Sequence, residues 1–379
     1  MENEPSQGGA LRQHAMLREI YAQPQAILET IQQHVREDII FGSALHAIEN
    51  ALLTFRKIII AASGSSRHAG LAGEIMIEDL TGTPVDVEYA SEYCYRSTHA
   101  GADPIVMLIT QSGETADTIA AQREALARGS RTLAVCNVAG STISREASAL
   151  LLTHAGRELA VPATKSFTAQ LTVLYLFALF LARKRGRMTS EVIRAHLRRL
   201  LDIPAAIDSA LPVWDAQTSE CARHYLRAQT FLYLGRGVHY AIAREGALKL
   251  KESSYTHAEG YPTGELKHGP QALVAEGLPI VALVARDDSD PDSVLRYRKS
   301  VGILRDAKSH GARVIAVATE GDQEIGAIAD HVFFVPATSE LLLPILEVVP
   351  LQLLAYRIAV MNGCDVDHPR NLAKSVMTE

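Results

Sequence analysis

Short apolar segments alternate with helical patterns along the first half of the chain. These segments lie at residues 57–62, 105–110, 132–136 and, more weakly, 150–153. Short apolar runs rich in β-branched residues are typical of buried strands. Parallel neighbours in a sheet need a crossover connection, which is usually a helix. The alternation therefore predicts an α/β fold with a doubly wound parallel sheet flanked by helices.

The second half of the chain repeats this order of segments. The matching segments lie at residues 230–234, 279–285, 313–318 and 331–335. Matches in the same order, at a shift of roughly 170 to 180 residues, are the signature of an internal duplication. The sequence therefore predicts two domains of the same fold.

The duplication divides the chain into consecutive parts. We expect an N-terminal tail with packing helices, a first domain, a connector, a second domain and a C-terminal tail, at residues 1–44, 45–190, 191–215, 216–360 and 361–379. Residues 1–14 are polar and predict a loose tail. The last residues are also polar and predict neither a strand nor a well-formed helix.

Composition excludes several classes of protein. Hydrophobic residues make up 47% and charged residues 21% of the 379 residues, as in soluble globular proteins, and the net charge of −6 argues against binding nucleic acid through bulk charge. The N-terminus lacks a signal-peptide pattern, and the apolar run at 171–182 is too short to span a bilayer, so it predicts a buried helix. The 4 cysteines lack metal-ligand spacing. We expect a cytoplasmic protein without nucleic-acid or membrane partners, cofactor or metal.

Two hydroxyl-rich loops follow expected strands of the first half. They read Ser-Gly-Ser-Ser at residues 63–66 and Thr-Gln-Ser-Gly-Glu-Thr at 110–115. Loops at the carboxyl ends of parallel strands bind ligands, and the amides at a helix start attract anions. Plain helix capping explains the same residues, so both interpretations stay open. Neither loop has a dinucleotide or P-loop pattern, which favours a small phosphomonoester over a nucleotide.

A charged segment of the second half predicts a helix from Glu245 until near Gly260. Glu245, Lys249 and Glu252 are spaced so that their side chains share one helical face. One interpretation is a solvated surface helix with ion pairs. The other is an acid/base site, because the same helix would carry His257 and its Gly/Pro-rich exit loop would carry an imidazole.

Four stretches of the chain resemble the sugar isomerase (SIS) family, and in particular the isomerase half of glucosamine-6-phosphate synthases. Residues 110–118 resemble the family's phosphate loop, and residues 163–168 resemble another of its turns. Residues 234–270 are similar over nearly their whole length, and residues 365–375 resemble the active-site tail. The resemblance implies two duplicated SIS domains and an active-site tail.

The resemblance also implies roles for individual residues. The sugar phosphate would be held by Ser66, Thr110, Gln111, Ser112 and Thr115. The rest of the substrate would contact Ser65, Val161 and Ala373.

The implied catalytic residues come from the two most specific stretches. Glu252 would move a proton between C1 and C2 of the open-chain sugar, and Lys249 would tune the charge nearby. His268 would assist ring opening from the neighbouring subunit of a homodimer. Lys374 would contact the carbonyl carbon as an amine, and the mobile tail that carries it would close over the sugar.

The chain departs from the family pattern at Ser63, Ala163 and Ser166, which leaves the exact sugar open. No cysteine precedes the first expected strand, so we expect no glutamine hydrolysis. The expected activity is interconversion of glucosamine 6-phosphate and fructose 6-phosphate with free ammonia, physiologically as a deaminase. The alternatives are isomerisation of a related amino-sugar phosphate, supply of the amine to a synthase as a partner protein, and non-catalytic sensing of a sugar phosphate.

Overall fold

The computed structural model describes residues 14–37, 39–96 and 104–376. It contains two compact units, each named here for its sheet. Among the described residues, the first-sheet unit comprises residues 25–37, 39–96, 104–156, 166–203 and 375–376, and the second-sheet unit comprises residues 14–24, 157–165 and 204–374. The loose tail expected at residues 1–14 lies, except for its last residue, outside the described residues.

The sheet of the first-sheet unit has five parallel strands in the order β4-β3-β5-β6-β7. The strands are β3 (Ile58–Ala62), β4 (Val85–Tyr89), β5 (Ile105–Thr110), β6 (Arg131–Cys136) and β7 (Ala149–Leu152). All residues of β3 and β5 are buried, as expected for central strands covered on both faces.

Helices connect these strands and precede them. The crossovers and the helix after the last strand are α5 (Gly64–Thr81), α6 (Ala90–Tyr93), α7 (Ala116–Ala127), α8 (Thr142–Glu146) and α9 (Lys165–Lys184). Before the sheet come α3 (Gln23–His34), the hairpin β1 (Val35–Arg36) and β2 (Ile39–Ile40), η1 (His46–Ile48) and α4 (Glu49–Thr54). The packing helices expected before the first strand are therefore present.

The second-sheet unit has the same topology. Its strands are β8 (Thr230–Gly235), β9 (His257–Pro262), β10 (Pro279–Leu283), β11 (Arg313–Thr319) and β12 (His331–Val335). Their order is β12-β11-β10-β8-β9, and every neighbouring pair is parallel. In both sheets the first strand in sequence lies between the second and the third. The predicted fold of two duplicated, doubly wound domains is confirmed.

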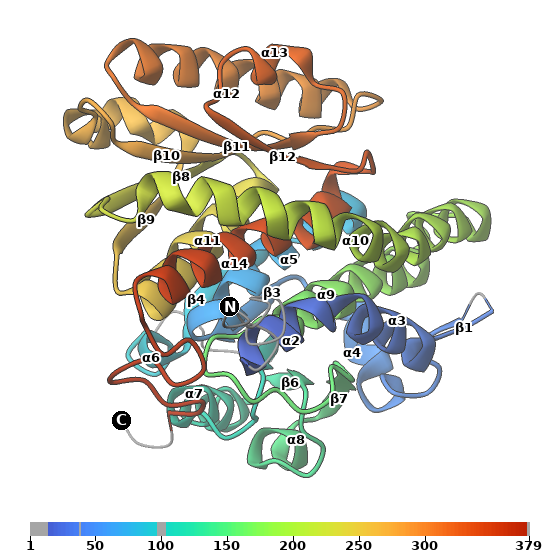
Figure 1. Cartoon of the computed structure of the whole chain (residues 1–379). Helices are drawn as coiled ribbons and strands as arrows, with labels where there is room; N and C mark the ends of the chain where they lie inside the picture. The colour runs from blue at the N-terminus through green and yellow to red at the C-terminus, as the bar shows by residue number, and fades with distance from the viewer. Residues whose placement is uncertain (1–13, 38, 97–103, 377–379) are drawn as a thin grey trace, which may run out of the picture. The chain divides into compact units, whose positions relative to one another are not determined.

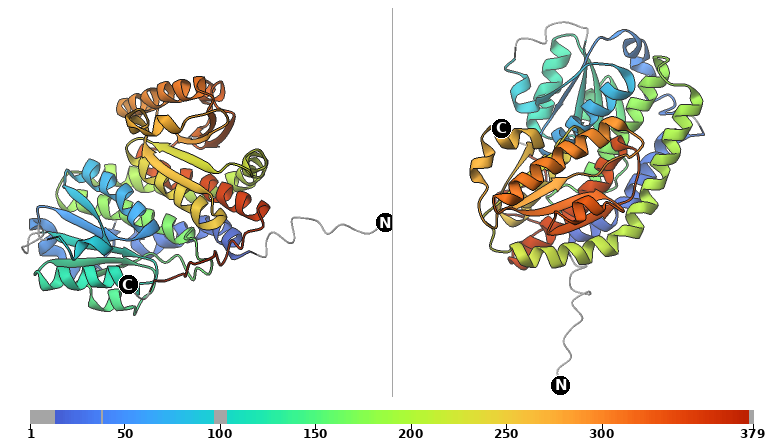
Figure 2. Two further views of the ribbon diagram at one scale, coloured as in Figure 1. Left: turned by 90° about the vertical axis from the view of Figure 1, so that its left-hand side faces the viewer. Right: turned by 90° about the horizontal axis from the view of Figure 1, so that it is seen from above.

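The helices of the second-sheet unit cover both faces of its sheet. They are α2 (Ala15–Tyr21), α11 (Val238–Ser254), η3 (Thr263–His268), η4 (Pro270–Leu273), α12 (Pro291–Ser309), α13 (Gln323–Gly326), η5 (Glu340–Leu342) and α14 (Leu343–Met361). Figure 1 shows α12 and α13 on one face of the sheet and α11 and α14 on the other. The orange α12 covers the strands in both views of Figure 2 as well.

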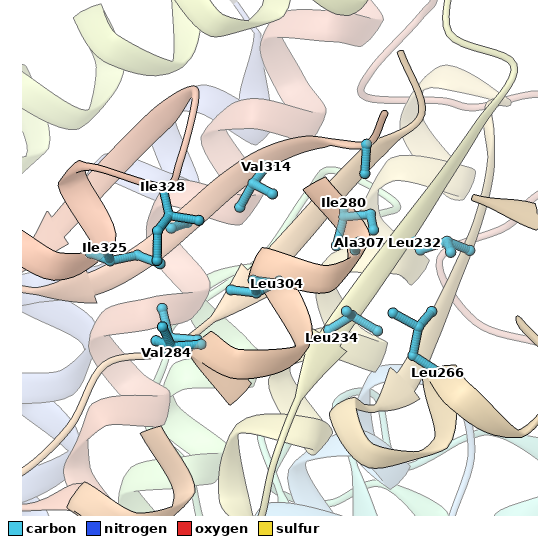
Figure 3. Close-up of a cluster of buried hydrophobic side chains, with 14 of the residues drawn as sticks. Leu232, Leu234, Leu266, Ile280, Val284, Leu304, Ala307, Val314, Ile325 and Ile328 are labelled. Atoms are coloured by element: carbon cyan, nitrogen blue, oxygen red, sulfur yellow. The ribbon is translucent and has the colours of Figure 1, made fainter. Parts of the chain in front are cut away.

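A buried cluster beneath α12 holds this unit together (Figure 3). Leu232, Ile280 and Val314 project from β8, β10 and β11, and Leu304 projects from α12; none of the four is exposed to solvent. Burying each such side chain contributes about 1.5–3 kcal/mol. Leu266 of η3 belongs to the same cluster, so the segment that leads to His268 is fixed to the core.

Each sheet has a fifth strand that the sequence did not predict. β4 reads Val-Asp-Val-Glu-Tyr and is half exposed, and β9 reads His-Ala-Glu-Gly-Tyr-Pro. Gly, Pro and acidic residues are depleted in strands, so neither segment resembles a buried strand. Both lie next to the first strand of their sheet, where tertiary pairing determines the conformation.

The helix expected to reach Gly260 ends earlier, at Ser254, so that prediction was wrong. Tyr255 adopts a left-handed conformation with φ of 62°, and its N–H bonds the carbonyl of Lys251. A left-handed residue ends a helix because the chain leaves the helical path there. His257 therefore belongs to β9, where it pairs with Thr230 of β8.

Two apolar helices are buried. The apolar run at 171–182 lies in α9 and is buried throughout, as predicted. Within the described residues, α9 and the stretch Glu340–Met361 are long and apolar enough to cross a membrane, but 94% of the apolar 18-residue window in each is buried, as in a core helix.

The expected connector at 191–215 is part of one long helix, α10 (Ser190–Tyr225), which contains Pro204 and Pro212. The boundary between the two units falls at the first of these prolines.

Candidate functional site

Three charged side chains meet on α11. The ammonium nitrogen Nζ of Lys249 lies 3.3 Å from Oε1 of Glu245 and 2.7 Å from Oε2 of Glu252. The side chains of Lys249 and Glu245 are fully buried, and that of Glu252 is 22% exposed. This burial rules out the solvated surface helix, one of the two interpretations left open by the sequence. Glu252 is the member of the row that solvent reaches.

Burial makes this charge row costly. Burial by itself disfavours the ammonium form of Lys249, but the charges of Glu245 and Glu252 outweigh that effect and raise the pKa of Lys249. Removing ions from water costs several kcal/mol per ion, and a buried ion pair often contributes little net stability. A strongly perturbed buried lysine next to a partly exposed carboxylate is instead typical of functional sites.

Close packing fixes the position of this row. A Cβ atom placed on Gly246 would lie 2.7 Å from Leu351 of α14 and 2.8 Å from the ring of Tyr233. Glycine at this position therefore lets α11 approach α14 and β8 closely. The residues on either side of Gly246, including Glu245, are held by that contact.

His268 ends η3 and is exposed. Leu266, two residues earlier, is buried in the core, and Gly269, one residue later, has a φ of 145° that favours glycine. The imidazole of His268 is therefore exposed, while the segment that leads to it is fixed to the core through Leu266.

The C-terminal tail carries an ion pair. Nζ of Lys374 lies 2.5 Å from Oε2 of Glu158; the side chain of Glu158 is fully buried and that of Lys374 is 26% exposed. Between α14 and Val376 the tail has neither helix nor strand, as predicted (Figure 1).

Asp367 attaches the tail to the second-sheet unit. Its carboxylate accepts hydrogen bonds from the first two amides of α2, those of Ala15 and Met16, each at 2.8 Å. Its own carbonyl accepts a hydrogen bond from the amide of Val161 at 2.9 Å. An acidic residue at the N-terminus of a helix satisfies otherwise unpaired amides and suits the helix dipole. His14, at the N-cap position of α2, makes no side-chain capping hydrogen bond. Asp367, which is distant in the sequence, caps α2 instead.

The segment that follows Gly156 is held by buried carboxylates. Glu19 of α2 accepts hydrogen bonds from the amides of Leu159 and Ala160, and Oε1 of Glu158 accepts one from the amide of Thr164 at 3.0 Å. Burial and the charge of Glu158 raise the pKa of Glu19.

In the first-sheet unit, the loop after β5 is organised by its own hydroxyl groups. Thr110 Oγ1 accepts a hydrogen bond from the amide of Gly113, and Ser112 Oγ accepts one from the amide of Glu114, both at 3.2 Å. A Cβ atom at Gly113, whose φ is 71°, would lie 2.0 Å from Oγ of Ser141. The loop therefore requires glycine there. The two hydroxyls bond amides within the loop, not amides of α7, so these hydrogen bonds do not cap that helix.

The amide end of α7 remains suited to an anion. Thr115 occupies the N-cap position but its side chain makes no capping hydrogen bond. The amide of Ala116, the first residue of α7, donates to the carbonyl of Val376 at 3.0 Å, and Ser375 Oγ lies 3.1 Å from Ser112 Oγ. The end of the tail thus contacts this loop within the first-sheet unit.

The residues expected to contact the substrate lie partly in the first-sheet unit and partly in the second-sheet unit. The first-sheet unit contains the residues expected to bind phosphate: Ser66 at the start of α5, next to the end of β3, and the others in or just before the loop after the neighbouring β5. Ser65, expected to contact the rest of the substrate, precedes Ser66 in α5. Ser66 Oγ accepts a hydrogen bond from Gln170 at 3.0 Å. Val161 lies in the segment held by Asp367 and Glu19, and Ala373 is exposed in the tail.

Sequence reasoning missed three acidic residues that position segments of the site. Glu19, Glu158 and Asp367 act on partners more than 100 residues away or in other elements, and no local pattern marks them. Glu245 was placed on the shared helix face but was given no role. Among the described residues, no group of three or more His, Cys, Asp or Glu side chains could hold a metal ion.

Comparison with known proteins identifies the family. The model of the SIS domain matches residues 52–180 and 224–362. The chain belongs to the SIS family. Both matches coincide with the two five-stranded sheets, so the resemblance expected from the sequence is confirmed.

Known SIS proteins are similar over nearly the whole chain. Glutamine–fructose-6-phosphate aminotransferase (isomerizing) of Chlorobaculum tepidum is 44% identical over 369 residues, which are 97% of this chain and 59% of the relative. The chain thus spans about three fifths of the length of this relative.

Solved SIS structures share the fold. The C-terminal domain of glucosamine-fructose-6-phosphate aminotransferase from Francisella tularensis is 36% identical with a TM-score of 0.88, covering 94% of this chain and 98% of the other. Glucosamine-6-phosphate deaminase from Thermotoga maritima, at 22% identity and a TM-score of 0.72 over 96% of this chain and 99% of the other, shows the fold alone.

Proposed function

We propose that this chain is a sugar-phosphate isomerase that interconverts glucosamine 6-phosphate and fructose 6-phosphate with free ammonia, and that it acts physiologically as a deaminase. The observation that carries the proposal is Lys249, fully buried between two carboxylates, one of which is partly exposed. The name of the relative from Chlorobaculum tepidum supports a hexose-phosphate substrate.

In this proposal the loop after β5 binds the sugar phosphate. The hydroxyl and amide side chains of this loop, together with the amide end of α7, offer neutral hydrogen-bond donors, which suit a phosphate without a nucleotide. The hydroxyls of Ser112 and Thr115 would donate to the phosphate oxygens.

Glu252 then transfers the proton between C1 and C2. The transfer converts an aldose into a ketose without any change in overall oxidation state, so no external oxidant is needed. The ammonium of Lys249, 2.7 Å away, favours the ionised carboxylate that accepts the proton. General acid–base catalysis of this kind typically contributes about 10²–10⁴-fold.

Lys374 and His268 complete the chemistry. The amine of Lys374 attacks the carbonyl carbon C2 of the open-chain ketose, and His268 of a neighbouring subunit assists ring opening. The exposed position of His268 supports the second role.

The deciding experiment is incubation of the purified chain with glucosamine 6-phosphate while ammonia and fructose 6-phosphate are measured. The proposal expects both products in equal amounts, and the reverse reaction with fructose 6-phosphate and ammonium. Tight sugar-phosphate binding without turnover in either direction would instead identify a non-catalytic sensor.

A further inference from the structure

The ion pair in the tail defines a binding place for a primary ammonium group. Glu158 is fully buried, and its Oε2 lies 2.5 Å from Nζ of Lys374. A buried, ionised carboxylate is costly without a cation close to it, so a cation is expected beside Glu158 whenever this carboxylate is ionised.

Glu158 is fixed independently of Lys374. Its other oxygen, Oε1, accepts hydrogen bonds from the amide of Thr164 at 3.0 Å and from the hydroxyl of Thr164 at 3.5 Å. The amides of the next two residues are held by Glu19. Glu158 Oε2 therefore stays in place when the more exposed Lys374 moves toward a substrate.

We propose that Glu158 is the ammonium-binding carboxylate of this site, an inference that rests on the proposed function. It holds Nζ of Lys374 in the resting state, and it holds the second substrate, ammonium, when Lys374 has bonded to the sugar. Both cations are primary or simple ammonium groups that donate N–H to a carboxylate, so one oxygen can serve both.

When ammonia replaces Nζ of Lys374 at C2, Glu158 takes up one proton and later returns it. In the amination direction, Nζ of Lys374 forms an imine with C2. The carbonyl oxygen leaves as water with two of the three Nζ hydrogens, and the third leaves to solvent as a proton. Ammonium gives one proton to Glu158, and the resulting ammonia adds to C2 through its lone pair. The bond between C2 and Nζ then breaks and Nζ keeps the electron pair.

The hydrogens are conserved in this exchange. Nζ receives two protons from the ammonia nitrogen and one from Glu158, and the fourth hydrogen of the ammonium ion remains on the new imine nitrogen at C2. The products are the unsubstituted imine and the ion pair of Lys374 with Glu158, as seen in the structure. Glu252 then moves the proton from C1 to C2, and deamination follows the same steps in reverse.

The test is the dependence of amination on ammonium in Glu158→Gln, compared with wild type and with Glu320→Gln, which removes an exposed carboxylate of the same unit. We expect the KM for ammonium to rise by about tenfold or more, because a charge-assisted hydrogen bond is lost. The KM for fructose 6-phosphate should change by less than about threefold, because the phosphate loop is intact. Glu158→Asp should recover part of the ammonium affinity, which a purely structural role would not explain.

A second measurement uses wild-type protein alone, so it also decides the matter if Glu158→Gln does not fold. Methylammonium should compete with ammonium but not with fructose 6-phosphate, whereas potassium ion, which has no N–H donor, should have no effect at the same ionic strength. Unchanged ammonium KM in folded Glu158→Gln, or no competition by methylammonium, would overturn this assignment alone. Wild-type protein without turnover in either direction would overturn the proposed function and this assignment with it.

Discussion

The side chains of Glu252 and Lys249 differ in their exposure to solvent, although they lie one turn apart on the same helix. Lys249 has no exposed surface, whereas 22% of the Glu252 side chain is exposed. Only Glu252 can therefore meet a sugar without rearrangement of α11. We propose that Lys249 acts through its charge, with Glu245, 3.3 Å away, as the second carboxylate that keeps this lysine paired when Glu252 changes.

Glu252→Gln should lower turnover by about 10²–10⁴-fold, because the amide cannot accept the proton from C1 or C2. Sugar-phosphate affinity should change only a few-fold. In deuterated water, wild type should incorporate deuterium at C1 or C2, and the variant should not. Glu265→Gln, which removes an exposed carboxylate of η3, is the matched control. Undiminished deuterium exchange in Glu252→Gln would remove this residue from the mechanism.

The double substitution of Ser112 and Thr115 by alanine tests the phosphate loop. In the proposed function each hydroxyl donates a hydrogen bond to a charged phosphate, worth about 1.5–3 kcal/mol, so calorimetry should show at least about tenfold weaker binding of a phosphorylated sugar. Stability should fall only slightly, because Ser112 Oγ accepts one hydrogen bond from the amide of Glu114 and Thr115 makes no capping bond. Ser144→Ala, which removes a hydroxyl from the neighbouring α8, should bind like wild type. Unchanged affinity in the double variant would remove these two hydroxyls from the proposed phosphate site.

Between elements, a buried charge cluster joins the start of α11 to η5 and α14. His239 Nδ1 lies 2.9 Å from Glu347, its Nε2 lies 3.2 Å from Glu340, and Arg296 also contacts Glu340. Burial alone would lower the pKa of His239, but the carboxylates of Glu347 and Glu340 raise it to about 10. The pKa of Glu340 falls to about 2, since the hydrogen bonds from His239 and Arg296 outweigh burial.

These pKa values predict how the free energy of unfolding depends on pH. The raised pKa of His239 contributes stability that is fully present below its unfolded value of 6.5 and is lost as pH rises toward about 10. The lowered pKa of Glu340 contributes stability that is present above 4.5 and is lost as pH falls toward about 2. Urea unfolding should therefore show a plateau between these limits and a decline above pH 6.5 that is reduced in His239→Gln. The exposed His310→Gln is the control, and an identical alkaline decline in both variants would contradict the prediction.

At the scale of the whole molecule, the question is whether one chain contains a complete site. His268 is exposed at the end of η3, while Glu252 and Lys249 are buried or half-buried on α11. If His268 acts in a neighbouring subunit, the active protein is at least a dimer, which sedimentation or light scattering would show.

Complementation gives the sharper test of a shared site. Glu252→Gln and His268→Ala should each be inactive alone, and mixing them should restore part of the activity, because one hybrid site then contains both intact residues. Subunit exchange is verified with tagged chains. A mixture of Glu252→Gln with Lys374→Ala serves as a control. Each site takes both of these residues from the same chain, so no hybrid site would contain both intact. Exchange without recovered activity in the first mixture would exclude the shared site.

The sequence by itself determined the features that depend on neighbouring residues. Apolar runs such as 57–62 and 279–285 marked the central strands, because a strand buried on both faces needs a local apolar sequence. Their repetition predicted the duplicated fold, and the helical spacing of Glu245, Lys249 and Glu252 placed these side chains on one face.

Only the tertiary structure decided the features that depend on distant partners. β9 forms because β8 offers it an unpaired edge, although Gly260 and Pro262 oppose strand structure locally. The structure shows that Lys249, which the sequence allowed at the surface, is a fully buried charge. The contact between Glu158 and Lys374 joins residues 216 positions apart, and no local pattern can encode a pair that chain folding alone brings together.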